Sequence, residues 1–227
     1  MEKRTTGIID LDRVTQGGLP AGQTTLVLGE AAAGKTVLAL QVLAGGIERG
    51  GAGVFVSFEE SPAQIRQDAA SFNWGESLIE ADSLEVIDAR PRLSAETAGE
   101  FDLEGLLSIV TATSRQKGAA WIVFDGIDQL LRHQVGHNAA INQIRRVDEA
   151  CAENGWTLLL TGKTRHDETE PFHLEGIEFL LSATVMLSAR IVDQQLNRSL
   201  RIAKFRGSAH VTDELPMLID DDGIALP

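Results

Sequence analysis

Residues 29–36 have the sequence GEAAAGKT, which matches the spacing G-x-x-x-x-G-K-[ST] of a phosphate-binding loop. In such a loop, backbone N–H groups surround phosphate oxygens, the lysine reaches the β- and γ-phosphates, and the hydroxyl binds Mg²⁺. We therefore expect Lys35 to contact the phosphates of a nucleoside triphosphate and Thr36 to bind Mg²⁺. The alternative is that the glycines only form a tight turn. The other residues expected to line this site are Gly29, Glu30, Ala31, Ala32, Ala33, Gly34 and Val37.

Acidic residues follow two of the predicted strands. Asp125 ends the apolar run WIVFD, and Glu59 and Glu60 end the run SFEE. The carboxyl ends of parallel strands share the edge at which such sheets bind ligands, so we expect these carboxylates beside the phosphates. Asp125 is predicted to bind Mg²⁺, and the glutamates to activate the attacking water, with either of them as the general base. The alternatives are a helix cap for Asp125 and solvated acids at a helix start for the glutamates.

The segment 204–210, KFRGSAH, places basic residues around Gly207 and Ser208 at the end of a predicted strand. Basic groups at a strand end are in a position to bind an anion. The alternative is a solvated turn with incidental charge.

Short apolar runs alternate with helix-forming segments along the chain. Runs with little polar alternation suit strands that are buried on both faces of a parallel sheet. We predict an α/β fold, a phosphate-loop domain with a largely parallel central sheet flanked by helices and extra antiparallel strands at the C-terminal end. The strands are expected at 23–29, 53–58, 83–88, 121–125, 156–161, 183–189, 199–205 and 217–219, and the helices at 37–48, 62–72, 103–117 and 139–154.

The composition fits one domain that spans residues 1–227, with 43% hydrophobic and 23% charged residues. No apolar stretch has the roughly 18 residues that a membrane helix needs, and no signal peptide is evident, so we expect a cytoplasmic protein. The net charge of −13 argues against general nucleic-acid binding, because affinity for the phosphate backbone comes from clustered Lys and Arg.

Taken together, these motifs resemble the KaiC-like branch of the RecA-type ATPases. The resemblance rests on residues 6–22 (TGIIDLDRVTQGGLPAG), the phosphate loop, residues 57–62 (SFEESP), the Asp125 strand and residues 204–210, in the family's order. It implies binding of ATP with Mg²⁺, slow hydrolysis, and homohexameric rings with ATP between subunits. It also implies that nucleotide state controls ring conformation and the binding of regulatory protein partners, in clock-like or signalling regulation.

The same resemblance implies that the segment 204–210 reaches the nucleotide of a neighbouring subunit. Lys204 and Arg206 would contact phosphate, and Arg206 would be catalytic as an arginine finger that stabilises charge in the transition state. Residues implied to contact the nucleotide elsewhere are Phe205, Ser208 and His210, together with Ser71 and Asp221.

This sequence departs from the family pattern in three places. Clock KaiC proteins carry two such domains in tandem, so we expect either a single-domain relative or an N-terminal, ATPase-type domain. Residues 31–33 are all Ala where the family usually has Gly, Ser or Thr, and Glu30 adds a negative charge near the phosphates. The Ser-Thr pair that is autophosphorylated in the second clock domain aligns with Phe179 and Leu180, so autokinase activity is not expected.

Two other functions compete with a partner-regulated ATPase. One is a RecA-like DNA-dependent ATPase, either a recombinase or a motor; the other is a KaiC-type serine/threonine kinase that acts on a partner. The loops expected to face the centre of a ring, 126–138 and 162–172, are not strongly basic. This composition disfavours the DNA-dependent reading.

Overall fold

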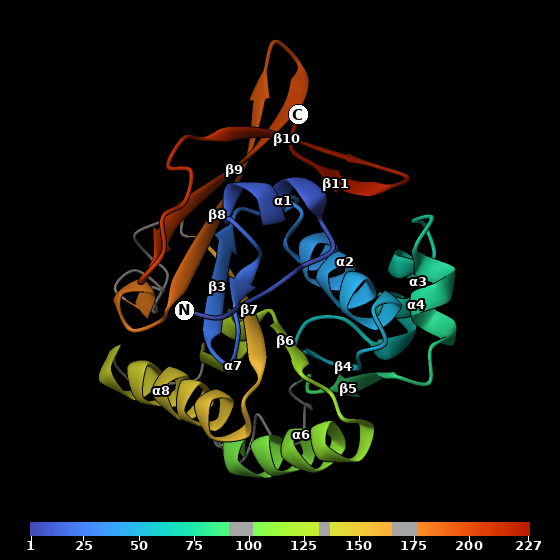
Figure 1. The fold of residues 1–227 in the computed structure, drawn as a ribbon, viewed down its shortest axis with the longest axis vertical. Helices are drawn as coiled ribbons and strands as arrows, with labels where there is room; N and C mark the ends of the chain where they lie inside the picture. The colour runs from blue at the N-terminus through green and yellow to red at the C-terminus, as the bar shows by residue number, and fades with distance from the viewer. Residues whose placement is uncertain (91–101, 132–136, 165–176) are drawn as a thin grey trace.

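A computed structural model describes residues 1–90, 102–131, 137–164 and 177–227 of the chain. Within these residues, nine strands form one sheet in the order β11-β10-β9-β8-β3-β7-β6-β4-β5 (Figure 1). Neighbouring strands from β8 to β5 run parallel, and β9, β10 and β11 continue the sheet antiparallel. The predicted α/β fold class is therefore confirmed. The strands are β3 (Thr24–Gly29), β4 (Gly53–Ser57), β5 (Leu84–Asp88), β6 (Trp121–Asp125), β7 (Thr157–Lys163), β8 (Ala183–Val192), β9 (Gln195–Phe205), β10 (Leu215–Asp220) and β11 (Gly223–Ala225).

Helices cover both faces of this sheet because its parallel strands are apolar on both sides. On β3, Val27 packs into a core that includes Leu38 of α2, whereas Leu26 and Leu28 pack into a second core with Val110 of α6. Figure 1 shows α6 and α8 lying together on their side of the sheet. The described helices are α1 (Ile9–Val14), α2 (Lys35–Glu48), α3 (Pro62–Ala69), α4 (Gly75–Glu80), α6 (Leu103–Lys117), α7 (Ile127–Leu131) and α8 (His137–Asn154), with a 3₁₀ turn at Ile177–Phe179 and a small ribbon of β1 (Lys3–Arg4) and β2 (Leu19–Pro20).

Predicted boundaries differ from the structure where a turn or cross-strand pairing sets the end of an element. The helix predicted at 62–72 ends at Ala69, because Ser71 and Phe72 donate backbone hydrogen bonds to Asp68 and Ala69 in a turn. The strands predicted at 183–189 and 199–205 extend to Val192 and back to Gln195, joined by a two-residue turn in which both residues have positive φ. The tip of this hairpin projects beyond the rest of the sheet (Figure 1).

Candidate functional site

The phosphate loop connects β3 to α2 at the carboxyl edge of the parallel strands. Gly34, immediately before α2, has a φ of +99°, a conformation that favours glycine. A Cβ at this position would lie 2.6 Å from Cδ1 of Ile219, which lines the same pocket. A side chain here would therefore narrow the space that a phosphate group needs.

Lys35 is half-buried and curves back over this loop. Its Nζ donates hydrogen bonds to the carbonyl oxygens of Gly29 at 3.0 Å and Glu30 at 2.7 Å. Burial lowers the pKa of Lys35, and the negative charge of Asp125 opposes that shift. The ammonium group is thus held within the loop, where it can exchange backbone oxygens for phosphate oxygens.

Thr36 and Asp125 are brought into contact, as the sequence predicts for a pair of magnesium ligands. The Thr36 hydroxyl donates to Asp125 Oδ2 at 3.1 Å, and the Thr161 hydroxyl donates to Oδ1 at 2.6 Å. Asp125 is only 3% exposed, and this burial raises its pKa, although both hydroxyl donors oppose the shift. A hydroxyl and a carboxylate are hard oxygen donors of the kind Mg²⁺ prefers, so this pair fits the ion.

The Mg²⁺ would need phosphate and water oxygens as further ligands. Across the described ranges, no cluster of three or more His, Cys, Asp or Glu side chains is arranged to hold a metal ion. Magnesium bound through one or two protein oxygens and substrate phosphates is the usual arrangement in phosphate-loop sites.

Glu59 is held at the mouth of this site by donors from two elements. Its Oε1 accepts hydrogen bonds from Gln129 Nε2 of α7, at 2.8 Å, and from Lys163 Nζ at the end of β7. Burial favours the neutral acid, but these two hydrogen bonds and the Lys163 charge outweigh it and lower the pKa of Glu59. The side chain also lies against Gly126, where an added Cβ would come within 2.7 Å of Glu59 Cγ.

Glu60 lies in a different environment from its neighbour. Burial raises the pKa of Glu60, with further contributions from Asp68 and from the charge of Asp125. Its Oε2 is buried and has no hydrogen-bond donor among the described residues. The start of α3 is instead capped by Ser61, whose hydroxyl accepts from Gln64 N at 3.2 Å. This arrangement favours a role for the glutamates at the site over the helix-start alternative.

A pocket of about 500 Å³ unites these groups. Arg198 of β9 also lines it, with Nε donating to the Ala32 carbonyl at 3.1 Å. Arg198 is not among the predicted site residues, because the strand predicted at 199–205 starts one residue after it; the extended hairpin brings it to the loop. Of the predicted loop residues, Gly29, Glu30 and Ala33 are not in the lining, which consists of Ala31, Ala32, Gly34, Lys35, Thr36, Val37, Glu59, Glu60, Asp125, Gly126, Asp128, Thr161, Lys163, Arg198 and Ile219.

Ser71 and Asp221 belong to segments that meet beside α2. The backbone N–H of Asn73 donates to the Asp221 carbonyl at 2.8 Å, and Asn73 Nδ2 donates to Asp222 Oδ1 at 2.6 Å. Neither Ser71 nor Asp221 lines the phosphate pocket. Ile219 of β10, two residues before Asp221, lies against Gly34 of the phosphate loop.

The segment 204–210 lies away from the pocket of its own chain. Lys204 of β9 pairs with Thr184 of β8, and Thr184 pairs with Leu26 of β3. Lys204 therefore lies level with the first half of β3, whereas the phosphate loop follows the end of that strand. Its Nζ donates to the carbonyl oxygens of residues 178, 179 and 181 at 2.7, 3.0 and 2.8 Å. Arg206 donates to the Phe179 carbonyl, and Ser208 to that of Ala209. The ring centroids of Phe205 and His210 are 6.0 Å apart.

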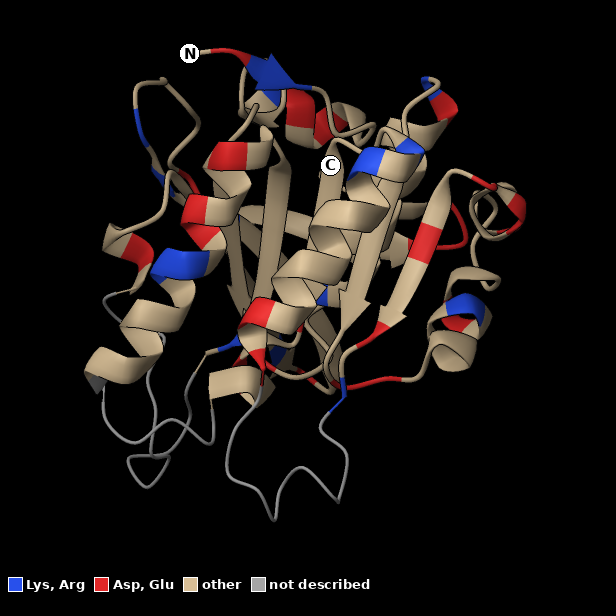
Figure 2. Cartoon of the chain, turned by 90° about the horizontal axis from the view of Figure 1, so that it is seen from below, with Lys and Arg blue, Asp and Glu red and all other residues tan. Residues whose placement is uncertain are grey.

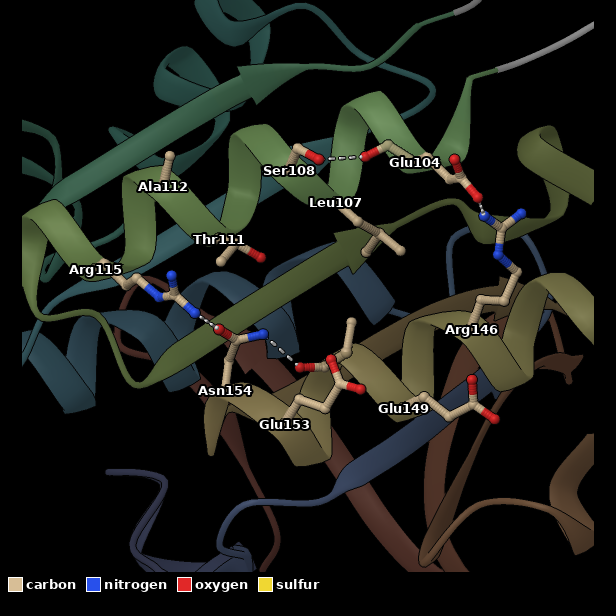
Figure 3. A pocket seen from close by; sticks show the side chains of 11 residues that line it. Glu104, Leu107, Ser108, Thr111, Ala112, Arg115, Arg146, Glu149, Glu153 and Asn154 are labelled. Carbon is tan, nitrogen blue, oxygen red and sulfur yellow. Dashed lines mark hydrogen bonds and ion pairs between the residues drawn. The ribbon is translucent and has the colours of Figure 1, made fainter.

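A second hollow, of about 630 Å³, lies between α6 and α8. Side-chain contacts join the two helices across it, from Arg146 to Glu104 and from Arg115 to Asn154 (Figure 3). None of the predicted site residues lines this groove.

The parallel sheet, the loop that leads into α2 and the buried Asp125 beside Thr36 define a RecA-like phosphate-loop ATPase fold. Residues 4–226 match the family model described as "ATPase: KaiC". The chain therefore belongs to the KaiC ATPase family. None of the described helices has the length and apolar character needed to cross a membrane.

Several relatives carry the same family name. The "Circadian clock oscillator protein KaiC" of Prochlorococcus marinus subsp. pastoris is 35% identical over 228 residues, covering 99% of this chain and 45% of that protein. The protein of the same name from Parasynechococcus marenigrum is 34% identical over 230 residues, covering 100% of this chain and 45% of the relative. The "Circadian clock protein KaiC2" of Synechocystis sp. is 33% identical over 227 residues, covering 99% of this chain and 40% of that protein. The chain thus spans less than half the length of each of these relatives.

Proposed function

We propose that this chain binds ATP with Mg²⁺ and hydrolyses it slowly to ADP and phosphate. The observation that carries the proposal is the contact between Thr36 and Asp125 in the pocket that also holds Lys35. Bound Mg²⁺ would neutralise charge on the β- and γ-phosphates. Lys35 would exchange its two backbone acceptors for phosphate oxygens.

The glutamates would act on the attacking water. Glu59 is in the proton-accepting form because its donors stabilise the carboxylate, and Gln129 holds it in place. Glu60, whose pKa is raised by burial, adds a second carboxyl group in the same pocket. Turnover of the single variants Glu59→Gln and Glu60→Gln would assign the general base.

We further propose that residues 1–227 act as one domain in the cytoplasm, within a homohexamer that holds ATP between subunits. Lys204, near the end of β9, and Arg206, just after it, do not line the pocket of their own chain, so we assign their charges to the nucleotide of a neighbouring copy. Phe205, Ser208 and His210 would lie along the same neighbouring nucleotide, while Ser71 and Asp221 would contact the nucleotide of their own chain.

The nucleotide state of this assembly would control its conformation and the binding of regulatory proteins, in clock-like or signalling regulation. The sequence has 20 Lys and Arg against 33 Asp and Glu, and in the view of Figure 2 the positions of both kinds are interspersed along the cartoon. This distribution supports protein partners over nucleic acid. Of the loops expected at the ring centre, residues 132–136 and 165–172 lie outside the described residues. Phe179, with its carbonyl bound to Lys204 and Arg206, offers no hydroxyl for autophosphorylation.

The test is release of phosphate from ATP by the purified chain, with Mg²⁺ and with EDTA. Wild-type protein is expected to hydrolyse ATP only with Mg²⁺, and a folded Lys35→Ala variant is expected to bind no ATP. Hydrolysis that persists in EDTA, or ATP binding by Lys35→Ala, would refute the assignment.

A further inference from the structure

Lys163 is a second lysine in the nucleotide pocket, and its backbone is fixed from two sides. It is opposite Gly29 in the β3–β7 pairing, so it emerges beside the first residue of the phosphate loop. Its backbone N–H donates to Asp128 Oδ1 at 3.2 Å, and the N–H of Thr164 donates to the Gly29 carbonyl at 3.2 Å. The side chain therefore starts from a well-defined point at the edge of the pocket.

The ammonium group of Lys163 forms an ion pair with Glu59 Oε1. The same oxygen accepts a hydrogen bond from Gln129 Nε2, so Glu59 has a neutral donor as well as a charged one. The side chains of Lys163 and Glu59 are 39% and 29% exposed. Ion pairs with this much access to water are weak, and losing the pair would leave Glu59 still held by Gln129.

A γ-phosphate would compete with Glu59 for this ammonium group. It carries more negative charge than a carboxylate and offers more acceptor oxygens. The position of Lys163 also fits contact with the γ-phosphate. The lysine of a phosphate loop reaches the β- and γ-phosphates. Lys163 lies near that lysine, since its charge contributes to lowering the pKa of Lys35. Glu59, which pairs with Lys163, is the carboxylate proposed to face the attacking water.

We propose that Lys163 is a positioning residue that responds to the γ-phosphate: it restrains Glu59 in the ligand-free pocket and transfers to the γ-phosphate of bound ATP. Glu59 then keeps its bond to Gln129 and gains a free lone pair for the attacking water. ADP has no γ-phosphate and leaves the Lys163–Glu59 pair intact. The inference rests on the proposed ATPase function and adds that this lysine distinguishes a triphosphate from a diphosphate.

The test compares Lys163→Met with Lys163→Arg, and uses Lys117→Met as a matched control. Lys117 also pairs with carboxylates, those of Asp82 and Glu85, but it lies outside the pocket. The dissociation constants of ATP and ADP and the parameters kcat and KM are measured for each folded variant. Lys163→Met is expected to lose about tenfold or more of its preference for ATP over ADP, the scale of one charge-assisted hydrogen bond, with ADP affinity unchanged.

The turnover number of Lys163→Met is expected to fall as well, Lys163→Arg is expected to restore much of both properties, and Lys117→Met should match wild type. An unchanged ATP-to-ADP preference in Lys163→Met, or an equal loss of affinity for both nucleotides, would overturn the inference while leaving the ATPase assignment intact. Wild-type protein that binds neither nucleotide would instead refute the proposed function, and the inference with it.

Discussion

The hydroxyl of Thr36 lies 3.1 Å from Asp125 Oδ2 and donates a hydrogen bond to it, joining the start of α2 to the end of β6. The two residues are 89 positions apart in the sequence. The fold therefore brings the hydroxyl and the carboxylate proposed to hold Mg²⁺ face to face. Coordination of the ion would replace one hydrogen bond without moving either element.

Removal of the Thr36 hydroxyl should weaken binding of ATP with Mg²⁺. We expect Thr36→Ala to lose at least about tenfold in affinity, because one of the two protein oxygens offered to the ion is gone. Thr36→Ser keeps the oxygen and is expected to remain near wild type. Titration calorimetry with and without Mg²⁺ measures both. Wild-type affinity in a folded Thr36→Ala protein would contradict the role of this hydroxyl.

Replacement of both glutamates should separate binding from hydrolysis. The double variant Glu59→Gln/Glu60→Gln is expected to bind ATP normally and to hydrolyse it roughly a hundredfold more slowly, the scale of general-base catalysis. Each single variant then assigns the base, and Glu76→Gln, an exposed acid of α4, is the control. Phosphate release in single-turnover conditions measures the rates. Near wild-type turnover in the double variant would remove both residues from the mechanism.

The opposite pKa shifts of the two glutamates predict opposite effects of pH on stability. Burial raises the pKa of Glu60, so its contribution to stability is present below the pKa of the unfolded chain and is lost as pH rises through the folded value. Glu60→Gln should therefore melt at a higher temperature than wild type at about pH 8, with the difference shrinking toward about pH 4.

Glu59→Gln serves as the internal control for that measurement. Although burial opposes ionisation, the donors Gln129 and Lys163 lower the pKa of Glu59, so its contribution is present above the unfolded pKa and is lost as pH falls. This variant should melt at a lower temperature than wild type at neutral pH. If both variants shifted the melting temperature in the same direction at every pH, the described difference in environment would be wrong.

Gly126 should affect catalysis through Glu59. Its φ is +81°, and a Cβ would lie 2.7 Å from Glu59 Cγ, so Gly126→Ala combines backbone strain with displacement of that side chain. Gly118→Ala is the matched control, since its φ is +65° and nothing lies within 4 Å of an added Cβ. Both variants should lose about 1 kcal/mol of stability or more, but only Gly126→Ala should slow hydrolysis. Equal turnover in Gly126→Ala and Gly118→Ala would show that Gly126 has no effect on catalysis through Glu59.

The fold class, and the grouping of Lys35, Thr36 and Asp125 in one pocket, could be predicted from the sequence because both depend on local pattern. The apolar run at 121–125 matches β6, the helix-forming segment at 103–117 matches α6, and the phosphate loop supplies the pocket residues around Lys35. The contact of Thr36 with Asp125 followed from the rule that parallel strands end at one edge.

Arg198 and the partners of Glu59 depend on tertiary contacts, which no local pattern encodes. Arg198 reaches Ala32 only because the β8–β9 hairpin is longer than its apolar run, and the polar residues of that hairpin are stabilised by cross-strand pairing. Gln129 and Lys163 come from α7 and from the end of β7, and converge on one carboxylate oxygen. Their roles become visible only when these elements are assembled.

Mixing two inactive variants tests the claim that one copy of the chain completes the nucleotide site of another. Lys35→Ala lacks a working phosphate loop, and Arg206→Ala lacks the proposed arginine finger, worth about a thousandfold or more in rate. In a randomly mixed ring with head-to-tail interfaces, about a quarter of the interfaces pair an intact loop with an intact Arg206. We predict that an equimolar mixture recovers roughly a quarter of wild-type ATPase activity, because each head-to-tail interface joins the loop of one subunit to Arg206 of the next. A mixture no more active than its separate components, or full activity in an Arg206→Ala monomer, would contradict the claim.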